Sequence, residues 1–262
     1  MTDYSAAQPA PASGTFSVGG VIKRSFSTYR ANFASFTVLA LILYLPTLVL
    51  TSAQVNEVAG ESWRVSVGTG ADTPTEAAIL LLSLVLTYAL VGALVFGTVQ
   101  HLNGRKAGVR EIIGRGFSRI VPVIVIAILF SIALGIGLLL VVVPGIFLLV
   151  VWSVAIPASV VERSGIFGAF DRSWQLTKGY RWPVLGILLI LLAILIGLQL
   201  TIGILVAIAV FATDSLFLVI AINYVVTAIS GALMSVAIAV IYHDLRVAKE
   251  GVSTAQLAAV FD

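Results

Sequence analysis

The sequence predicts an all-α protein, a polytopic bundle of six transmembrane helices. Three observations lead to this fold class. Apolar residues make up 60% of the chain and charged residues only 10%, whereas about a quarter of the residues in a soluble domain are charged. The apolar residues form runs long enough to cross the hydrocarbon of a bilayer. The basic residues gather between these runs, and the mean hydropathy is +1.11.

Each expected span is an apolar run without Asp, Glu, Lys or Arg. A helix rises about 1.5 Å per residue and therefore needs about 20 residues to cross the bilayer core. Pro144–Gly145 is a strong turn signal between the third and fourth runs, and a single kinked span over 120–161 is the alternative. The expected spans are 34–53, 77–100, 120–143, 145–161, 184–212 and 216–242.

The basic residues predict the orientation. Fourteen of the fifteen Lys and Arg residues fall in the segments on one side of the six spans, and only Arg64 falls on the other. Because Lys and Arg are concentrated in cytoplasmic loops, both termini are expected in the cytoplasm. This arrangement places the 144–145 turn on the far side of the membrane.

The segments outside the spans are short. Residues 1–15 are of low complexity and are expected to form a disordered tail. A single membrane domain is expected over 16–250, followed by a short cytoplasmic segment over 251–262. The one sizeable outer loop, 54–76, is acidic.

A short polar and aromatic segment begins each cytoplasmic stretch before a pair of spans. Each opens with Gly followed by Val or Ile, and an aromatic residue stands nine positions after the Gly. We interpret the pattern as three repeats of an amphipathic interfacial helix followed by a two-span hairpin; chance similarity is the alternative. The glycines and their aromatic partners are Gly20 and Tyr29, Gly108 and Phe117, and Gly165 and Trp174.

The third of these segments, which we call the elbow (residues 165–182), is a candidate lipid-headgroup site. At helical spacing, one face carries apolar and aromatic residues for the acyl chains, and the other carries polar residues for water and phosphates. An ordinary cytoplasmic loop is the alternative. The apolar face is expected to contain Ile166, Phe167, Phe170, Trp174 and Leu176. The expected headgroup and interface residues are Arg172, Lys178, Arg181, Trp174 and Trp182.

Small residues recur every four positions along the sixth span, at Thr227, Gly231, Ser235 and Ala239. Small residues let helix backbones approach closely in a membrane, and Asn223 is expected to add an interhelical hydrogen bond. The stripe is interpreted as a packing seam within one chain, with a homodimer face as the alternative.

A resemblance to a large bacterial family is carried by the stretch PGIFLLVVWSVAIPASVVERSGIFGAFDRSWQLTKGYRWPVLGILL (144–188). The family is the membrane domain fused to some glycerophosphodiester phosphodiesterases, together with free-standing YciC-like inner-membrane proteins. The ending YHDLRVAKEG (242–251) is also similar, with His243 as an extra residue. The resemblance implies a helical inner-membrane protein. The phosphodiesterase chemistry belongs to a separate soluble domain, and no acidic and His cluster for its metal is present here.

These features favour a non-enzymatic module of the bacterial inner membrane that binds lipid or a partner protein. A transporter or channel for a small or lipidic solute is the alternative, because transporters often contain internal repeats. No nucleophile–base pair occurs at depth, so we expect no enzymatic activity, cofactor or metal. Membrane lipids are the expected partners, with a membrane protein or a second copy of the chain as further candidates and no nucleic acid. A lipid-sized cleft is expected where Pro157 bends the fourth span.

Overall fold

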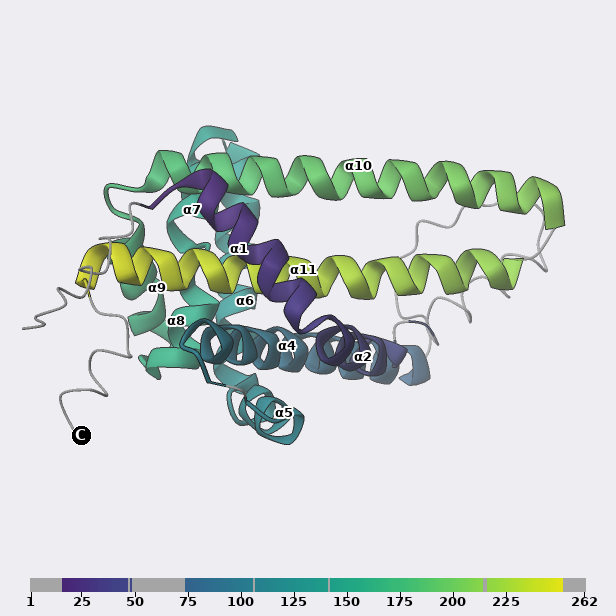
Figure 1. Cartoon of the computed structure of the whole chain (residues 1–262), viewed down its shortest axis with the longest axis horizontal. Helices are drawn as coiled ribbons and strands as arrows, with labels where there is room; N and C mark the ends of the chain where they lie inside the picture. The colour runs from purple at the N-terminus through teal and green to yellow at the C-terminus, as the bar shows by residue number, and fades with distance from the viewer. Residues whose placement is uncertain are drawn as a thin grey trace, which may run out of the picture.

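The computed structural model describes residues 16–46, 48, 74–105, 107–140, 142–213 and 216–251, and every regular element in this part of the chain is an α-helix (Figure 1). The all-α prediction is therefore confirmed. The predicted tail over 1–15, nearly all of the outer loop and all but the first residue of the segment 251–262 lie outside the described residues.

The helices follow one another in the predicted order, in which a short helix precedes a pair of long apolar segments three times. The first group is α1 (Val18–Ala31), α2 (Phe33–Leu43) and α4 (Pro74–Leu102). The second is α5 (Val109–Ser118), α6 (Ile120–Leu140), α7 (Val142–Trp152) and α8 (Ala155–Glu162). The third is α9 (Gly165–Thr177), α10 (Arg181–Thr213) and α11 (Leu216–Glu250).

Among the described residues, five helical segments are long and apolar enough to cross a membrane, or up to six if the bent pair α1–α2 counts as one. The bend in that pair is 81°. At the bend, the Asn32 side chain donates a hydrogen bond to the Thr28 carbonyl at 3.0 Å, which satisfies an acceptor at the end of α1. The short helix α1, which carries polar residues, thus turns sharply into the apolar α2.

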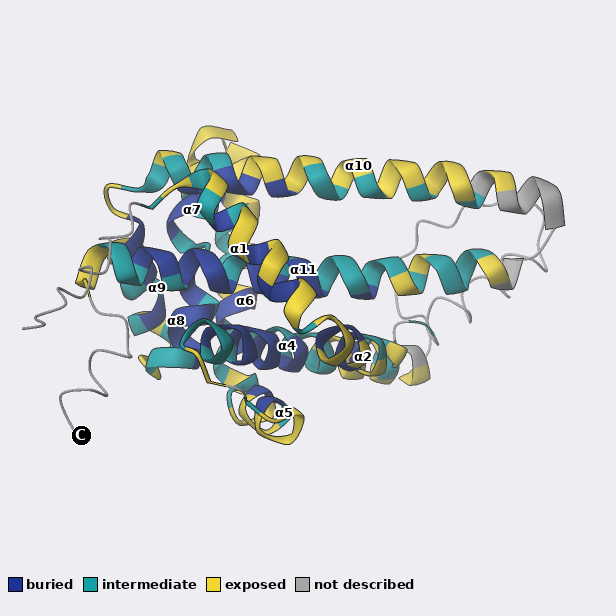
Figure 2. Cartoon of the chain, in the orientation of Figure 1, coloured by how far each residue is buried: buried dark blue, intermediate teal, exposed yellow. Residues whose placement is uncertain are grey.

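The last helix, α11, is the centre of the bundle. It packs against α1, α2, α4 and α10, and its C-terminal half is buried on most of its faces (Figure 2). Small residues such as Ser235, Ala237 and Ala239 in this half let the neighbouring helices approach it closely. Much of α10 is exposed in contrast, which for an apolar helix indicates a lipid-facing surface.

The α6–α7 hairpin is closed tightly by two glycines. A Cβ atom added to Gly137 would lie 3.0 Å from the Gly145 Cα, and one added to Gly145 would lie 2.5 Å from the Leu138 side chain. Backbones this close leave no room for larger residues. Helix α7 already begins at Val142, so Pro144 and Gly145 lie in its first turn, and the chain reverses just before them, after α6 ends at Leu140.

The position of that turn differs from the prediction. The Phe147 ring lies 5.9 Å from the Trp174 ring of the elbow, and the Trp152 ring lies 4.9 Å from that of Phe170. The chain order of these two pairs means that α7 runs antiparallel beside α9. Pro144 is three residues before Phe147, about 5 Å along a helix, whereas the opposite face of a bilayer core is about 30 Å away.

The expectation that the 144–145 turn lies on the far side from the elbow is therefore wrong. Figure 1 shows α6 and α7 running across α10 and α11, near the end where α11 finishes. The physical reason is that α7 and α8 pack on α9, whereas the apolar run over 120–161 carries no signal for its direction. Hydropathy predicts an apolar environment but not the side on which a hairpin turns.

A break separates α7 from α8 at Ser153–Val154, in the middle of the fourth predicted span. Pro157 lacks the N–H that would bond the Ser153 carbonyl, so it interrupts the helical ladder there. The Ser153 hydroxyl donates to the Val150 carbonyl at 2.9 Å. The predicted interruption at Pro157 is thus present as a break in the helix, and α7 and α8 together form one candidate span, Val142–Glu162.

Candidate functional site

The elbow is a helix, α9, bounded by two residues with left-handed backbone conformations. Gly165 at its start has a φ of 74° and Gly179 after its end has a φ of 89°. Glycine adopts these conformations without a Cβ clash, so the chain can turn sharply before and after α9. Pro183 in the first turn of α10 suits a helix start, because its missing N–H needs no partner there.

One face of α9 packs on the protein through hydroxyl groups. Ser173 Oγ donates to the Val151 carbonyl at 2.7 Å, and Thr177 Oγ1 lies 3.4 Å from the same oxygen. These bonds satisfy a carbonyl next to the end of α7, where the helical ladder stops. Leu176 is on this face and is only 1% exposed, so the expectation that it faces the acyl chains is wrong: it is part of the protein core.

The guanidinium of Arg181 lies over two aromatic rings that contact each other edge to face. Its Cζ lies 4.6 Å from the Trp174 ring centroid and 4.9 Å from that of Phe147. Cation–π contacts of this kind contribute roughly 0.5–2 kcal/mol each. The Arg181 Nε is buried and has no hydrogen-bond partner among the described residues, and such a charged donor favours an acceptor from outside the chain. We call Phe147, Trp174 and Arg181 the aromatic–arginine cluster.

Other exposed residues lie on the same segment, the elbow. Trp182 is 82% exposed and Phe167 is 80% exposed, while Trp174 is 41% exposed. Lys178 is also exposed and follows α9 directly. Large aromatic rings at the surface beside cationic groups are typical of the headgroup level of a membrane. The structure therefore brings together four of the five predicted residues on one short segment.

The fifth, Arg172, lies in a different environment. Its Nε donates to the Glu162 carboxylate at 2.7 Å, and its Nη2 donates to Glu250. Burial by itself would lower the pKa of Arg172, but Glu250 and Glu162 outweigh it and raise the pKa. Arg172 thus joins α8, α9 and α11, and the prediction that it binds a headgroup is replaced by this structural role, because two carboxylates already hold its guanidinium.

Two more side chains complete this arrangement, which we call the ion-pair network. The Tyr242 hydroxyl donates to the other oxygen of Glu162 at 2.7 Å, and Arg246 Nε donates to Glu250 at 3.0 Å. At the other side of α11, Arg24 Nε donates to Asp244 at 2.9 Å. These contacts hold α1, α8 and α9 on the last turns of α11. The members of the ion-pair network are Glu162, Arg172, Tyr242, Arg246 and Glu250.

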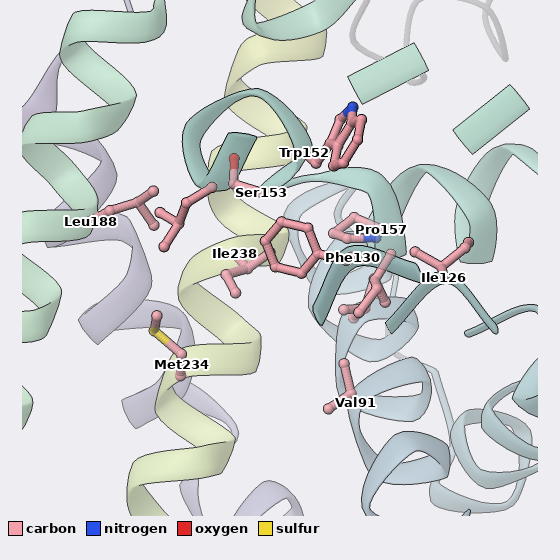
Figure 3. A pocket seen from close by; sticks show the side chains of 12 residues that line it. Val91, Ile126, Phe130, Trp152, Ser153, Pro157, Leu188, Met234 and Ile238 are labelled. Carbon is pink, nitrogen blue, oxygen red and sulfur yellow. The ribbon is translucent and has the colours of Figure 1, made fainter. Parts of the chain in front are cut away.

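A cavity of about 210 Å³ lies next to the helix break, as the bend at Pro157 predicts. Figure 3 shows its walls, which come from α4, α6, α7, α8, α10 and α11. Ser153 is the one residue with a polar side chain among those that line it, apart from the indole N–H of Trp152. The lining residues labelled in Figure 3 are Val91, Ile126, Phe130, Trp152, Ser153, Pro157, Leu188, Met234 and Ile238.

The predicted packing stripe divides into a buried part and an exposed part. A Cβ atom on Gly231 would lie 2.6 Å from the Tyr44 hydroxyl, and Ser235 and Ala239 are buried. This part is a seam within the chain, against α2 and other helices. Asn223 is exposed and accepts from Thr227 on the same helix at 3.4 Å, and among the described residues it has no interhelical partner. Its expected interhelical bond stays a prediction.

Sequence reasoning missed Phe147 as a site residue because it was assigned to the far side of the membrane. It also missed the partners of Arg172. Glu162 and Tyr242 each stand at the edge of an apolar run, and an acid and a hydroxyl at such edges are signals that could have suggested a polar contact between the two ends.

The family defined as a domain of unknown function, DUF7847, matches residues 64–245, which include the elbow, the cavity and most of the described helices. No curated protein and no solved structure matches the chain. The resemblance to the phosphodiesterase-associated and YciC-like membrane proteins stays a prediction.

Proposed function

We propose that this chain, which belongs to the DUF7847 family, is an integral membrane protein whose elbow binds the headgroup of an anionic phospholipid. The observation that supports the proposal is the Arg181 guanidinium, which lies over the rings of Phe147 and Trp174 and has a buried Nε without a partner among the described residues. Arginine presents a planar fork of donors that suits phosphate oxygens. The contacts with the two rings hold the guanidinium at the surface before the lipid arrives.

Lys178 and Trp182 extend the site along the surface. A basic residue near an anionic membrane contributes about 1 kcal/mol to binding, so Arg181 and Lys178 together favour an anionic over a neutral headgroup. Trp182 and Trp174 match the amphipathic headgroup level, where an indole ring contacts both acyl chains and water. Arg172 is excluded from this role because Glu162 and Glu250 neutralise it.

The same proposal places the molecule in the bacterial inner membrane with both termini in the cytoplasm. The excess of Lys and Arg on one side supports this orientation. Helices α2, α4, α10 and α11 then cross the membrane, and the α6–α7 hairpin is inserted in the cytoplasmic leaflet beside the elbow. Because four is an even number of crossings, both termini are still on the same side of the membrane. The predicted orientation therefore does not depend on which side the α6–α7 hairpin turns.

The test is the lipid selectivity of the full chain in detergent. Wild type and the double variant Arg181→Gln/Lys178→Gln are titrated with phosphatidylglycerol and phosphatidylcholine, and bound lipid is counted by native mass spectrometry. We expect the double variant to lose the preference for phosphatidylglycerol by at least roughly tenfold, since two cations contribute about 1 kcal/mol each. Arg105→Gln, an exposed arginine of another cytoplasmic segment, is the matched control and should change it less than about twofold.

Equal binding of the anionic and the neutral lipid by wild type would contradict the proposal. So would an equal loss of selectivity in Arg105→Gln, because this outcome would assign the effect to total charge and not to the elbow. The transport alternative stays a prediction, since no contact in the described part of the chain favours it.

A further inference from the structure

We infer that the cavity beside the helix break holds one acyl chain of the phospholipid whose phosphate binds Arg181. This inference rests on the proposed headgroup site and goes further by assigning the place of a hydrocarbon chain. Its basis is the cavity (Figure 3), together with the aromatic–arginine cluster and the first turns of α10.

The lining of the cavity selects hydrocarbon over water. The Ser153 hydroxyl already donates to the Val150 carbonyl at 2.9 Å, and the walls offer little else that is polar. A buried water needs two to four polar partners, and cavities lined by apolar side chains stay dry or take apolar guests. The occupant is therefore apolar where it meets Phe130, Leu188 and Met234.

The size of the cavity selects a single chain. Its volume is about 210 Å³, whereas sites for drug-sized ligands with ring systems usually measure about 300–1,000 Å³. An apolar cavity of about 150 Å³ in another protein is large enough for benzene. The space therefore suits a segment of one flexible chain, and the second chain of the same lipid stays in the bilayer.

Helix α10 connects the headgroup site to the cavity. Arg181, Leu185 and Leu188 are spaced by four and then three residues and so lie on one face of the helix. The rise from Arg181 to Leu188 is about 10 Å, which the glycerol ester region and the first methylenes of a phospholipid can bridge.

The break between α7 and α8 explains why the cavity exists. The ladder of backbone hydrogen bonds stops at Ser153–Val154, and Pro157 on the next helix forms part of the cavity wall. A straight helix through this point would continue the packing of α7 against its neighbours. The proline break thus leaves the space that the chain occupies.

The experiment uses phosphatidylglycerol with a photoreactive diazirine on one acyl chain and the full-length protein in detergent. After irradiation, cross-linked residues are mapped by mass spectrometry, with and without an excess of unlabelled phosphatidylglycerol. We expect adducts on cavity residues such as Phe130, Leu188 and Met234 that the unlabelled lipid suppresses. Adducts confined to the exposed outer part of α10, such as Leu200 and Ile204, would overturn the inference.

Two substitutions at one lining position provide matched controls. Val91→Phe fills the cavity and should lower the yield of cavity adducts roughly tenfold, because added volume in a packed site opposes a guest. Val91→Ala enlarges the cavity and should preserve or raise the yield. Equal losses in both variants would overturn the inference. If Val91→Phe does not fold, suppression of the wild-type adducts by unlabelled lipid decides the outcome.

The two proposals fail in different ways. If phosphatidylglycerol binds selectively but produces no cavity adduct, the headgroup proposal is supported and the acyl-chain inference is wrong. If a photoreactive diacylglycerol without phosphate labels the cavity equally well, the link to Arg181 falls. If no selective binding of phosphatidylglycerol occurs, both proposals fall.

Discussion

The α10–α11 hairpin and the α6–α7 hairpin are built from similarly apolar helices but differ in their packing. Both pairs contain segments of sufficient length and hydropathy to cross a membrane. In α10, an added Cβ at Gly197 or Gly203 meets nothing within 4 Å, whereas at Gly137 and Gly145 it collides with the facing helix. Figure 1 shows α10 and α11 extending together along the molecule and the other pair lying across them.

This difference shows that the hydropathy of a helix does not determine the direction in which it runs relative to the other helices. An apolar run predicts that a helix avoids water, and both hairpins satisfy that prediction. Direction depends on the contacts of particular residues, such as Phe147 with Arg181 and Trp174. Those contacts place α7 beside the elbow, where it contributes a ring to the candidate site.

The largest expected effect comes from opening the tight hairpin. Gly145→Ala should lower the free energy of unfolding by about 3 kcal/mol, because the new methyl group would lie 2.8 Å from the Leu138 backbone nitrogen. Gly197→Ala in α10 should instead raise it by about 0.5–1 kcal/mol, through helix propensity in open space. Titration with a denaturing detergent in mixed micelles measures both. Equal effects of the two variants would remove the distinction between the hairpins.

A smaller effect is expected from the ion-pair network, which holds the α7–α9 side of the molecule on α11. Glu162→Gln removes the charge that faces Arg172 and should cost about 2 kcal/mol, since it leaves a half-buried guanidinium with a poorer acceptor. Asp171→Asn is the control. Its exposed carboxylate contacts Gln175 one turn away, and its effect should stay within about 0.5 kcal/mol. The same detergent titration measures the free energy of unfolding of both variants. If Asp171→Asn lowers it as much as Glu162→Gln, the ion-pair network does not contribute more to stability than an ordinary surface contact.

The smallest effect is expected where α11 meets α2. Gly231→Leu should cost about 1 kcal/mol, because the side chain meets the end of the Tyr44 ring, which can move aside. Gly203→Leu on the neighbouring α10 faces open space and should leave the melting temperature in detergent unchanged or slightly raised. An unchanged melting temperature for Gly231→Leu would mean that this seam contributes little to the bundle.

Much of the fold could be predicted from the sequence because it depends on local patterns. The apolar runs predict the long helices, the Gly-initiated segments predict α1, α5 and α9, and Pro157 predicts the bend in the fourth run. These signals lie within a few residues of the structures that they produce. The direction of the α6–α7 hairpin depends on contacts between residues 18 or more positions apart, such as Trp152 with Phe170 and Phe147 with Trp174, and no local pattern encodes it.

The candidate site was predicted in part for the same reason. Trp174, Lys178, Arg181 and Trp182 belong to one short segment, and their types alone indicate a membrane surface. Arg172 has the same type and position, but its role depends on Glu162 and on Glu250, which is distant in the chain. Leu176 fits the apolar periodicity equally well in lipid or in the protein core, so periodicity could not distinguish the two.

The central claim is that the 144–145 turn and the elbow lie at the same face of the membrane. The chain contains no cysteine, so spin labels can be attached to Val143→Cys and Lys178→Cys in otherwise wild-type protein, and their separation measured by electron paramagnetic resonance in lipid bilayers. A second pair, Lys178→Cys and Leu205→Cys, calibrates the span of α10 at about 35 Å or more. The account predicts a separation below roughly 20 Å for the first pair; a separation of about 30 Å or more, the thickness of the bilayer core, would contradict it.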